Sequence, residues 1–510
     1  MSIDNAKPGW WESRAYLVAL LALSLVPFLF TSLPPMVDLP GHMARYAVAQ
    51  DDGALPGLAE FFDYRWKLAG NLGVDILVAL LAPIIGLKPA IAIVVMSIPP
   101  LFIAGFWMLS KEASGGRVPP TMGFILVLAF SHPFIFGFVN YCLSIALGMF
   151  VLAWWIRLGR EGRFRQRALV MLPAGLVVYI AHAFGWGLLG LAAFGAEWVR
   201  RRGLGEGLAS SAFRAGLGCW PLMLPFLHLI GWTLGRDGED AFTGFMFDWR
   251  FKTSFVLGTL RESDRMLDLL PLVPMFGLVG LAIFLKDFKW TAKPLLAAFL
   301  VTFAAFIAMP GTVVGSAYAD MRMTPVLFGL IILAFAPTSP RGALVIALLS
   351  LVFGLMRVGT VTVHSMRWDA AIQQRLEVVE GLEPGSRVFM LHGPTQCFDQ
   401  WVLRRTVHLG GYHIADNRGF ANNLWPLGNA SPLEFKPGIP KDWGRDPSQL
   451  SRLPDCGPLY MPLFTETMAN FPREHFDYLW LVDAPLLPEY EREFELLRES
   501  EGAKLYRIGD

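Results

Sequence analysis

The chain has 510 residues, of which 54% are hydrophobic and only 17% carry a charge, and its mean hydropathy is +0.46. This composition is too apolar for a water-soluble globular protein and predicts a polytopic α-helical membrane protein. A formal net charge of +1 argues against a nucleic-acid partner, because such binding depends on a basic surface that displaces counterions from phosphates.

The first apolar segment runs from Ala15 to Leu33 and predicts a transmembrane helix. No small-residue cleavage site follows the basic N-terminal residues, so we expect this helix to be kept and not removed as a signal peptide. A polar stretch from Pro34 to Tyr46 follows it directly. The ionisable groups of this stretch are therefore expected at a membrane surface, which is an unusual place to concentrate them.

The polar stretch predicts a helix over about residues 39–50, with Asp38 as its N-cap and Pro40 in its first turn. Asp38 and His42 are four residues apart and would share one face of that helix. Arg45 adds a guanidinium to the acid and the imidazole. The alternative is that Asp38 only caps the helix and that Arg45 only extends to lipid headgroups.

Apolar blocks recur from Ala15 to Val361, and several are shorter than the roughly 20 residues of a full span. We expect about 11–13 transmembrane helices in a domain over residues 1–361. The loops rich in Lys and Arg should be cytoplasmic under the positive-inside rule. These loops are Arg157–Arg167, Arg200–Arg202, Lys286–Lys289 and Arg341.

This orientation places the N-terminus inside and the Asp38 loop outside. It leaves one inconsistency. If Val74–Leu87 and Ala90–Leu109 both cross the membrane, Lys111–Arg117 falls outside and the later helices lose their parity. One member of the pair must therefore cross only halfway, and the prolines and glycine between Pro83 and Pro100 favour a broken or re-entrant segment there.

From Thr362 the composition becomes that of a soluble domain, and we expect an extracytoplasmic α/β domain over residues 362–510. Cys397 and Cys456 lie in this domain, and a disulfide between them is left open because the sequence does not place their Cα atoms. The predicted elements are helices at Asp369–Glu380 and Tyr490–Ser500 and strands at Ser386–Leu391, Tyr478–Val482 and Lys504–Ile508.

The outer-side segments collect polar residues that the apolar blocks otherwise avoid. Arginines in such a rim suit a phosphate, and a carboxylate suits the proton of an attacking hydroxyl, so an anionic lipid-linked substrate fits this set. The candidates are Asp38, His42, Arg45, Asp63, Asp75, Asn140, Tyr141, His182, Asp320 and Arg322.

Several candidates also have a purely structural explanation. Asn140 and Tyr141 fit an interfacial anchor, and His182 fits the hydrogen-bonded end of a helix. Arg322 would either pair with Asp320 at the rim or bind a phosphate.

The sequence gives no support for a zinc site or for the other enzyme classes that have a recognisable motif. His392, His408 and His413 do not have the spacing of a zinc site. No phosphate-binding loop, nucleophile elbow, HExxH or dinucleotide fingerprint stands in a suitable context. We therefore expect no cofactor, and a divalent cation is left open.

Four short stretches resemble the GT-C superfamily, namely Asp38–His42, Gly137–Tyr141, His182 and the segment from Pro310 to Arg322. This superfamily contains polytopic glycosyltransferases that use polyprenyl-phosphate-linked sugars, among them the protein O-mannosyltransferases and the lipid A aminoarabinose transferases. The resemblance extends to the whole architecture, with its outer C-terminal domain. It implies a GT-C-like membrane domain whose first outer loop, 34–72, forms helices along the membrane and carries the catalytic acid.

Carried onto this chain, the resemblance makes Asp38 the catalytic base, with His42 in the same site. Arg322 or Arg45 would stabilise the departing lipid phosphate. The other candidates would contact the substrate. The second acid that many members pair with the first is not distinguishable here. It would be one of Asp63, Asp75 and Asp320.

The resemblance implies transfer of a sugar from a polyprenyl-phosphate-linked donor to a glycan, lipid or protein acceptor. The site would lie on the outer face of a bacterial inner membrane, with the C-terminal domain in the periplasm, and membrane lipid would be a further partner. One alternative is a transporter or flippase of a lipid-linked saccharide, which would place charges near the bilayer midplane. The other is a non-catalytic subunit of an envelope polysaccharide assembly system.

Overall fold

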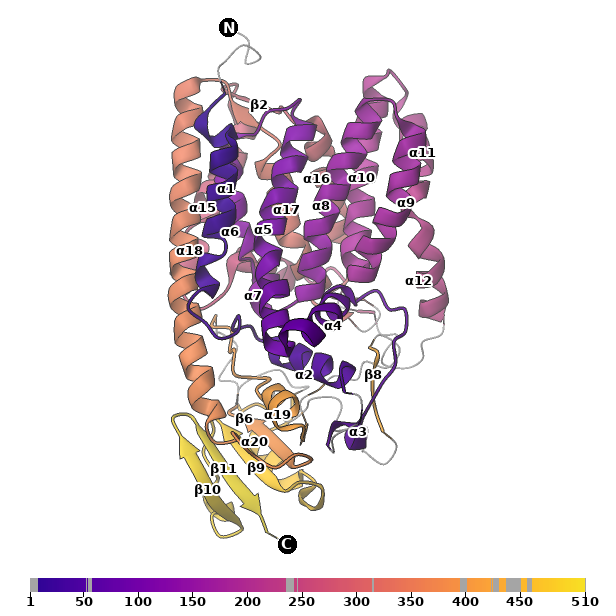
Figure 1. Ribbon diagram of the computed structural model, residues 1–510. Helices are drawn as coiled ribbons and strands as arrows, with labels where there is room; N and C mark the ends of the chain where they lie inside the picture. The colour runs from indigo at the N-terminus through magenta and orange to yellow at the C-terminus, as the bar shows by residue number, and fades with distance from the viewer. Residues whose placement is uncertain are drawn as a thin grey trace. The chain divides into compact units, whose positions relative to one another are not determined.

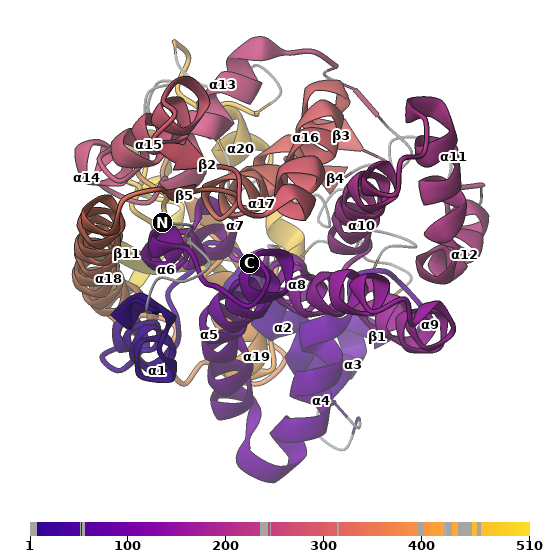
Figure 2. The ribbon, with the colours of Figure 1, turned by 90° about the horizontal axis from the view of Figure 1, so that it is seen from above.

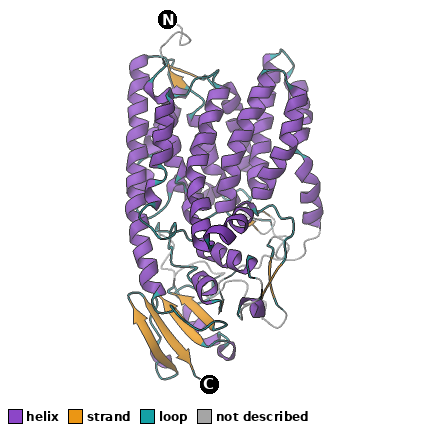
Figure 3. Cartoon of the chain, viewed as in Figure 1, coloured by secondary structure: helices purple, strands orange, loops and turns teal. Residues whose placement is uncertain are grey.

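The structure is a computed structural model, and its chain is mainly helical, with the strands gathered towards the C-terminal end of the sequence (Figures 1 and 3). It describes residues 8–51, 53, 57–234, 243–244, 246–313, 316–394, 401–422, 424, 431–436, 451–455 and 461–509. Cys397 and Cys456, the two cysteines considered for a disulfide, lie outside the described residues.

The chain divides into two compact units, and each is described by itself. Unit 1 consists of Met1–Phe30, Gly70–Val74 and Val95–Val363. Unit 2 consists of Thr31–Ala69, Asp75–Val94 and His364–Asp510.

Unit 1 is a helical bundle in which α10 packs against both α8 and α16 (Figure 2). All residues of α17 are buried, as expected of a helix surrounded by other helices, and after Thr324 they are all apolar. Its helices are α1 (Arg14–Leu23), α6 (Gly123–Ala129), α7 (His132–Phe136), α8 (Val139–Arg160), α9 (Phe164–Ala181), α10 (Ala183–Gly203), α11 (Leu208–Gly218), α12 (Leu224–Leu234), α13 (Trp249–Leu257), α14 (Arg265–Leu269), α15 (Leu272–Phe284), α16 (Lys293–Ala308) and α17 (Ala319–Ile332).

Three helices have residues in both units, namely α4 (Gly73–Ile85), α5 (Leu87–Ala113) and α18 (Pro340–Leu376). The 37 residues of α18 form one uninterrupted helix, about 55 Å long at 1.5 Å per residue. The helix predicted at Asp369–Glu380 is therefore confirmed as far as Leu376, as the continuation of the last apolar segment.

Among the described residues, five helices are long and apolar enough to cross a membrane, or six if α11 and α12 count as one bent span. The expected count of about 11–13 is not reached by this measure. The reason is that several apolar blocks of the sequence are divided. One block bends by 78° between α11 and α12, and another is split at Phe130 and Ser131 between α6 and α7.

The conflict between the apolar segments Val74–Leu87 and Ala90–Leu109 is resolved by α4, which contains most of the first segment. With 13 residues it is only about 20 Å long, too short to cross a hydrocarbon core by itself. It ends at Gly86, whose φ of +89° is readily adopted only by glycine. Contrary to expectation, α5 continues through Pro99 and Pro100. If α4 is not counted as a membrane-spanning helix, Lys111 and Arg117 fall on the same side of the membrane as the other basic loops.

Unit 2 is built on a five-stranded mixed sheet with the strand order β10-β11-β9-β6-β7. Strands β6 and β9 pair in parallel, and β11 pairs antiparallel with both β9 and β10. The predicted strands at Ser386–Leu391, Tyr478–Val482 and Lys504–Ile508 are confirmed. The sheet contains β6 (Arg387–His392), β7 (Phe420–Ala421), β9 (Tyr478–Val482), β10 (Phe494–Ser500) and β11 (Ala503–Ile508).

The remaining elements of unit 2 pack on this sheet or pair beside it. The described residues also form three short two-stranded sheets, one in unit 2 and two in unit 1. The helices are α2 (Leu39–Ala49), α3 (Leu58–Phe61), α19 (Gly410–Asn417) and α20 (Phe464–Asn470). The pairs are β1 (Phe62–Tyr64) with β8 (Leu433–Phe435), β2 (Phe288–Lys289) with β5 (Ala336–Pro337), and β3 (Thr312–Val313) with β4 (Ser316–Ala317).

The helix predicted at Tyr490–Ser500 is wrong, because most of that segment is the edge strand β10. Its register shifts between Leu496 and Arg498, and this bulge breaks the alternation that would have identified a strand. The resulting spacing of Tyr490, Phe494 and Leu497 resembles that of a helix.

Most of the first outer loop, as far as Ala69, belongs to unit 2 and contains less helix than expected. Within its described residues only α2 and the single turn of α3 are α-helical, and β1 follows them. Ala44, Ala47 and Val48 of α2 belong to the same hydrophobic core as Phe389 of β6 and Phe420 of β7. Burial against this sheet, and not a membrane surface alone, therefore accounts for the apolar face of α2.

Candidate functional site

Asp38 stands immediately before α2, where the sequence placed it. The helix from Leu39 is confirmed, and its first backbone bond runs from the N–H of His42 to the carbonyl of Asp38 at 3.1 Å. The predicted capping role is wrong, because the Asp38 side chain accepts no bond from the helix end. Pro40 in the first turn already removes one of the donors that a cap would satisfy.

The carboxylate of Asp38 faces a histidine from the C-terminal part of the chain. Nε2 of His408 lies 3.7 Å from Oδ1 of Asp38, and the two side chains are 6% and 13% exposed. This distance is within the range of an ion pair but longer than a hydrogen bond. The pair is therefore largely removed from water, with the carboxylate as its more accessible member.

A buried arginine holds the loop that leads to Asp38. Arg405 is fully buried, and its Nη1 donates a 2.9 Å hydrogen bond to the carbonyl of Pro35. Arg405 and His408 belong to the same short segment between β6 and α19. This segment thus contacts the chain both three residues before Asp38 and at Asp38 itself.

A close backbone approach fixes α2 against α19. A Cβ atom on Gly411 would overlap the carbonyl oxygen of Pro40, so only glycine fits at this position of α19. The start of α2, and Asp38 with it, is therefore positioned by direct contact with the helix that follows His408.

Gly411→Ala is expected to destabilise unit 2 by about 1–3 kcal/mol, because a methyl group would be forced against backbone that cannot rotate away. Thermal unfolding of the purified protein, followed by intrinsic fluorescence, measures this effect. Gly187→Ala in α10 is the matched control, because a Cβ at that helical position meets open space. An equal or higher midpoint for Gly411→Ala than for Gly187→Ala would contradict the close contact.

Arg45, expected to bind the phosphate, is engaged by Asp75. Its Nη2 donates to Oδ2 of Asp75 at 2.8 Å, and its Nε lies 2.8 Å from Oδ1. The side chains are 10% and 1% exposed. A buried two-point pair of this kind fixes α2 against α4 and uses much of the Arg45 fork. The pair also buries Asp75, so Asp75 is not a candidate for a second catalytic acid near solvent.

His42 and Tyr46 line the same face of α2, with their rings stacked at 6.3 Å. Tyr46 is buried, and the loss of water together with the Asp75 charge raises the pKa of its phenol. Tyr46 is therefore a neutral hydroxyl at physiological pH. His42 is partly exposed.

Asp63 lies apart from these residues, on the edge of unit 2. It is in β1, and its Oδ2 pairs with the nearby Arg65 at 2.6 Å. Both side chains are well exposed, at 37% and 73%. Such a surface pair contributes little to stability and does not resemble an enclosed substrate contact.

In unit 1, the side chains of Asn140 and His182 form hydrogen bonds at the N-terminal ends of helices. The Asn140 side chain accepts a 2.6 Å bond from the N–H of Val74 and donates to the carbonyl of Asn71 at 3.0 Å. His182 caps α10, with Nδ1 accepting from the N–H of Phe184 at 3.1 Å. The structural explanation given for His182 is thus confirmed, and Asn140 fixes the start of α4 instead of anchoring an interface.

Tyr141, His182 and Arg322 are brought together in unit 1. The Tyr141 hydroxyl donates a short bond to the carbonyl of Arg322, and its ring meets that of His182 edge-on at 5.7 Å. The Arg322 guanidinium lies 4.4 Å from the centre of the Phe138 ring and is 8% exposed as a residue. A contact of this kind with an aromatic face fixes the orientation of the guanidinium.

Asp320 does not pair with Arg322 and faces Lys252 instead. Nζ of Lys252 lies 3.7 Å from Oδ2 of Asp320, and both residues are buried. Tyr318, two residues earlier, has a φ of +59°, which is rare for a bulky side chain. Strain of this kind persists where the surroundings demand it, often at functional positions. The start of α17 therefore combines a strained backbone with a buried ion pair.

The sequence did not identify His408 or Arg405 as members of these clusters. His408 had been considered only as a metal ligand, and no group of three metal-binding side chains exists among the described residues. Its contact with Asp38 joins positions far apart in the chain, and a single sequence contains no signal for such a contact.

Neither a family model nor a curated protein sequence matches the chain. Two crystal structures of ArnT from Cupriavidus metallidurans do match it over nearly their whole length. The apo structure has a TM-score of 0.53 at 12% identity, over 96% of this chain and 97% of that one. The structure bound to undecaprenyl phosphate has a TM-score of 0.51 at 12% identity, over 97% and 98%. ArnT is a GT-C aminoarabinose transferase.

The chain has a GT-C fold. This fold, together with helices apolar enough to cross a membrane, identifies a multi-pass membrane protein. The arabinofuranosyltransferase AftD from Mycobacteria also aligns, with a TM-score of 0.48 at 14% identity over 98% of this chain and 42% of that one.

Proposed function

We propose that the chain is a membrane glycosyltransferase that takes a sugar from a polyprenyl-phosphate-linked donor. The observation that carries this proposal is the match to ArnT, a GT-C enzyme solved with undecaprenyl phosphate, over 97% of this chain. Within the chain, the enclosed carboxylate of Asp38 supports it, because that group follows the first apolar segment directly and does not cap its helix.

In the proposed reaction, an acceptor hydroxyl attacks the anomeric carbon of the sugar. The hydroxyl proton passes to the carboxylate of Asp38, which acts as the base. The bond between the anomeric carbon and the phosphate oxygen breaks, and its electron pair leaves with the polyprenyl phosphate. His408 positions the Asp38 carboxylate, and Arg405 holds the loop on which Asp38 stands.

In unit 1, Arg322 is our candidate for binding a phosphate, because its guanidinium is stacked on Phe138 with its orientation fixed. Arg45 is a weaker candidate, since Asp75 already occupies its fork. We also propose a bacterial inner membrane as the location, with the C-terminal part of unit 2 on the periplasmic side. Arg341 supports this orientation, because it lies at the start of α18, whose other end leads into the C-terminal part of unit 2.

The purified protein is expected to release polyprenyl phosphate and form a glycosylated product when incubated with labelled polyprenyl-phosphate sugars and crude envelope acceptors. Product formation is measured for a panel of donor sugars, with heat-inactivated protein as the control. In parallel, proteoliposomes loaded with the same donors report movement of the saccharide across the bilayer. Movement without any transfer, from every donor tested, would favour the flippase and contradict the transferase.

A further inference from the structure

Unit 1 contains a second polar feature, at the ends of helices that carry basic residues. A pocket of about 400 Å³ opens there, bounded by the last turns of α5, α8 and α10, the first turn of α9 and the start of α16. Four basic side chains and two carboxylates line it. They are Arg160, Arg167, Arg200 and Lys293, with Glu112 and Glu197.

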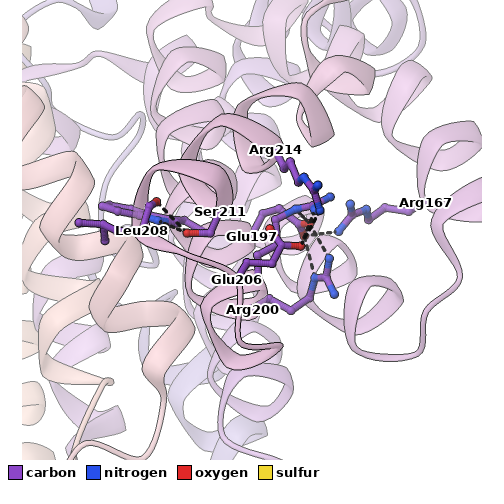
Figure 4. A network of polar contacts seen from close by, with 9 residues as sticks. Arg167, Glu197, Arg200, Glu206, Leu208, Ser211 and Arg214 are labelled. Atoms are coloured by element: carbon purple, nitrogen blue, oxygen red, sulfur yellow. Dashed lines mark hydrogen bonds and ion pairs between the residues drawn. The ribbon is translucent and has the colours of Figure 1, made fainter.

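One buried carboxylate organises the guanidinium groups (Figure 4). The Glu197 side chain is 1% exposed and contacts Arg167 at 2.9 Å, Arg200 at 2.6 Å and Arg201 at 3.0 Å. Arg201 also lies 3.2 Å from Glu206. Arg214 lies 3.6 Å from the same Glu206. Four arginines therefore share two carboxylates, and the cluster has an excess of positive charge in a site partly removed from water. Such an excess favours an anion from outside the protein.

Of the two other cations that line the pocket, Lys293 adds to this excess, whereas Arg160 is balanced by Glu112. Lys293 is exposed and has no ion pair among the residues that the structure describes. It opens α16, whose N-terminal backbone amides also favour negative charge. Arg160 is half-exposed and pairs with Glu112 at 2.6 Å.

Part of the pocket lining is apolar. The Arg167 guanidinium lies 3.9 Å from the centre of the Trp155 ring, which belongs to this lining. Ile156, Val199 and Leu204 continue it, and Leu204 is 67% exposed. A soluble anion would gain nothing from this surface, whereas a lipid would place its first acyl carbons on it.

We propose that this pocket binds the phosphate of an anionic phospholipid from the leaflet at the basic ends of the helices. Lys293 and the Nη1 of Arg200, whose Nε and Nη2 donate to Glu197, contact the phosphate, while the Glu197 cluster supplies the fixed positive field. Basic pockets between transmembrane helices are suited to lipid headgroups of this kind. The site is separate from the proposed transfer reaction, because none of its residues belongs to the Asp38 or Arg322 clusters.

The test uses delipidated full-length protein in dodecyl maltoside, with bound lipid counted by native mass spectrometry. Dioleoylphosphatidylglycerol is the anionic probe, and dioleoylphosphatidylcholine and inorganic phosphate are the comparisons. The double variant Arg200→Gln with Lys293→Gln removes two cations and leaves Arg167 and Arg201 on Glu197. Its matched control is Arg165→Gln with Arg341→Gln, two exposed arginines outside the pocket.

The wild type and the control variant are expected to bind phosphatidylglycerol in preference to phosphatidylcholine. The pocket variant should bind it about 30-fold more weakly, since each basic residue near an anionic headgroup contributes about fivefold. Lys293→Gln alone, which breaks no ion pair within the described residues, should lose about fivefold and guards against misfolding of the double variant. Equal affinity in the pocket and control variants would overturn the proposal. So would full competition by millimolar inorganic phosphate, which would identify a soluble anion as the ligand.

Discussion

Asp38→Asn is expected to slow sugar transfer at least about a hundredfold, the usual loss when a general base is removed. Asparagine keeps the size of the side chain and still fits before a helix, but it cannot accept the hydroxyl proton. The substitution should lower kcat more than it changes KM, because the carboxylate accepts the proton in the transition state and does not hold the bound sugar. Initial rates with the best donor from the panel measure both constants.

The control for this experiment is Asp416→Asn, which removes an acid of the same unit from an exposed pair with Lys88. Its activity should stay within about twofold of the wild type, as expected for a surface pair. Thermal midpoints of both variants must match the wild type for the comparison to hold. If Asp38→Asn transferred sugar at the wild-type rate, Asp38 would be a structural residue and another acid would have to serve as the base.

The local environment of Asp38 was predictable, whereas its partners were not. The residues around Asp38 determine the start of α2, because proline and the polar residues before an apolar repeat favour a helix start. The contact between Arg405 and Pro35 spans 370 residues, and nothing in either stretch points to the other. Pair contacts of this range depend on the packing of the whole unit. For the same reason, the Arg45–Asp75 pair was not foreseen.

Helix lengths were predictable only where the apolar pattern was uninterrupted. The full length of α8 follows from one continuous block that ends in Arg157 and Arg160, which suit the negative end of a helix. In contrast, hydropathy alone could not show that the chain turns at Gly86 and passes through Pro99 and Pro100. Proline is tolerated inside a helix when neighbouring groups compensate for the lost backbone bond.

Arg357→Met is expected to destabilise unit 1 by about 3–5 kcal/mol, the cost typical of leaving buried charges without their partner. Arg357 is completely buried in α18, and its Nη1 lies 2.7 Å from Asp268 and 3.2 Å from Glu262. Its Nη2 donates to the carbonyls of Phe130 at 2.7 Å and Leu260 at 2.9 Å. One guanidinium thus joins α18 to the end of α6 and to the loop before α14.

Unfolding in a titration with sodium dodecyl sulfate, followed by tryptophan fluorescence, measures the change in stability. Arg341→Met is the matched control, because it makes the same substitution at an exposed position of the same helix. Its midpoint should equal that of the wild type. A similar midpoint for Arg357→Met would show that the buried cluster contributes nothing to the stability of the bundle.

A rescue experiment separates lost charge balance from lost packing. Adding Glu262→Gln and Asp268→Asn to Arg357→Met removes the uncompensated carboxylates and should recover a large part of the stability, because a neutral buried group costs far less than a buried charge. The carboxylate of Asp268 accepts a 2.7 Å bond from the backbone N–H of Glu262, and an amide oxygen in its place would accept less strongly, so recovery should be incomplete. If the triple variant were no more stable than Arg357→Met alone, the two backbone carbonyls that Arg357 binds would account for its contribution, and its charge would not.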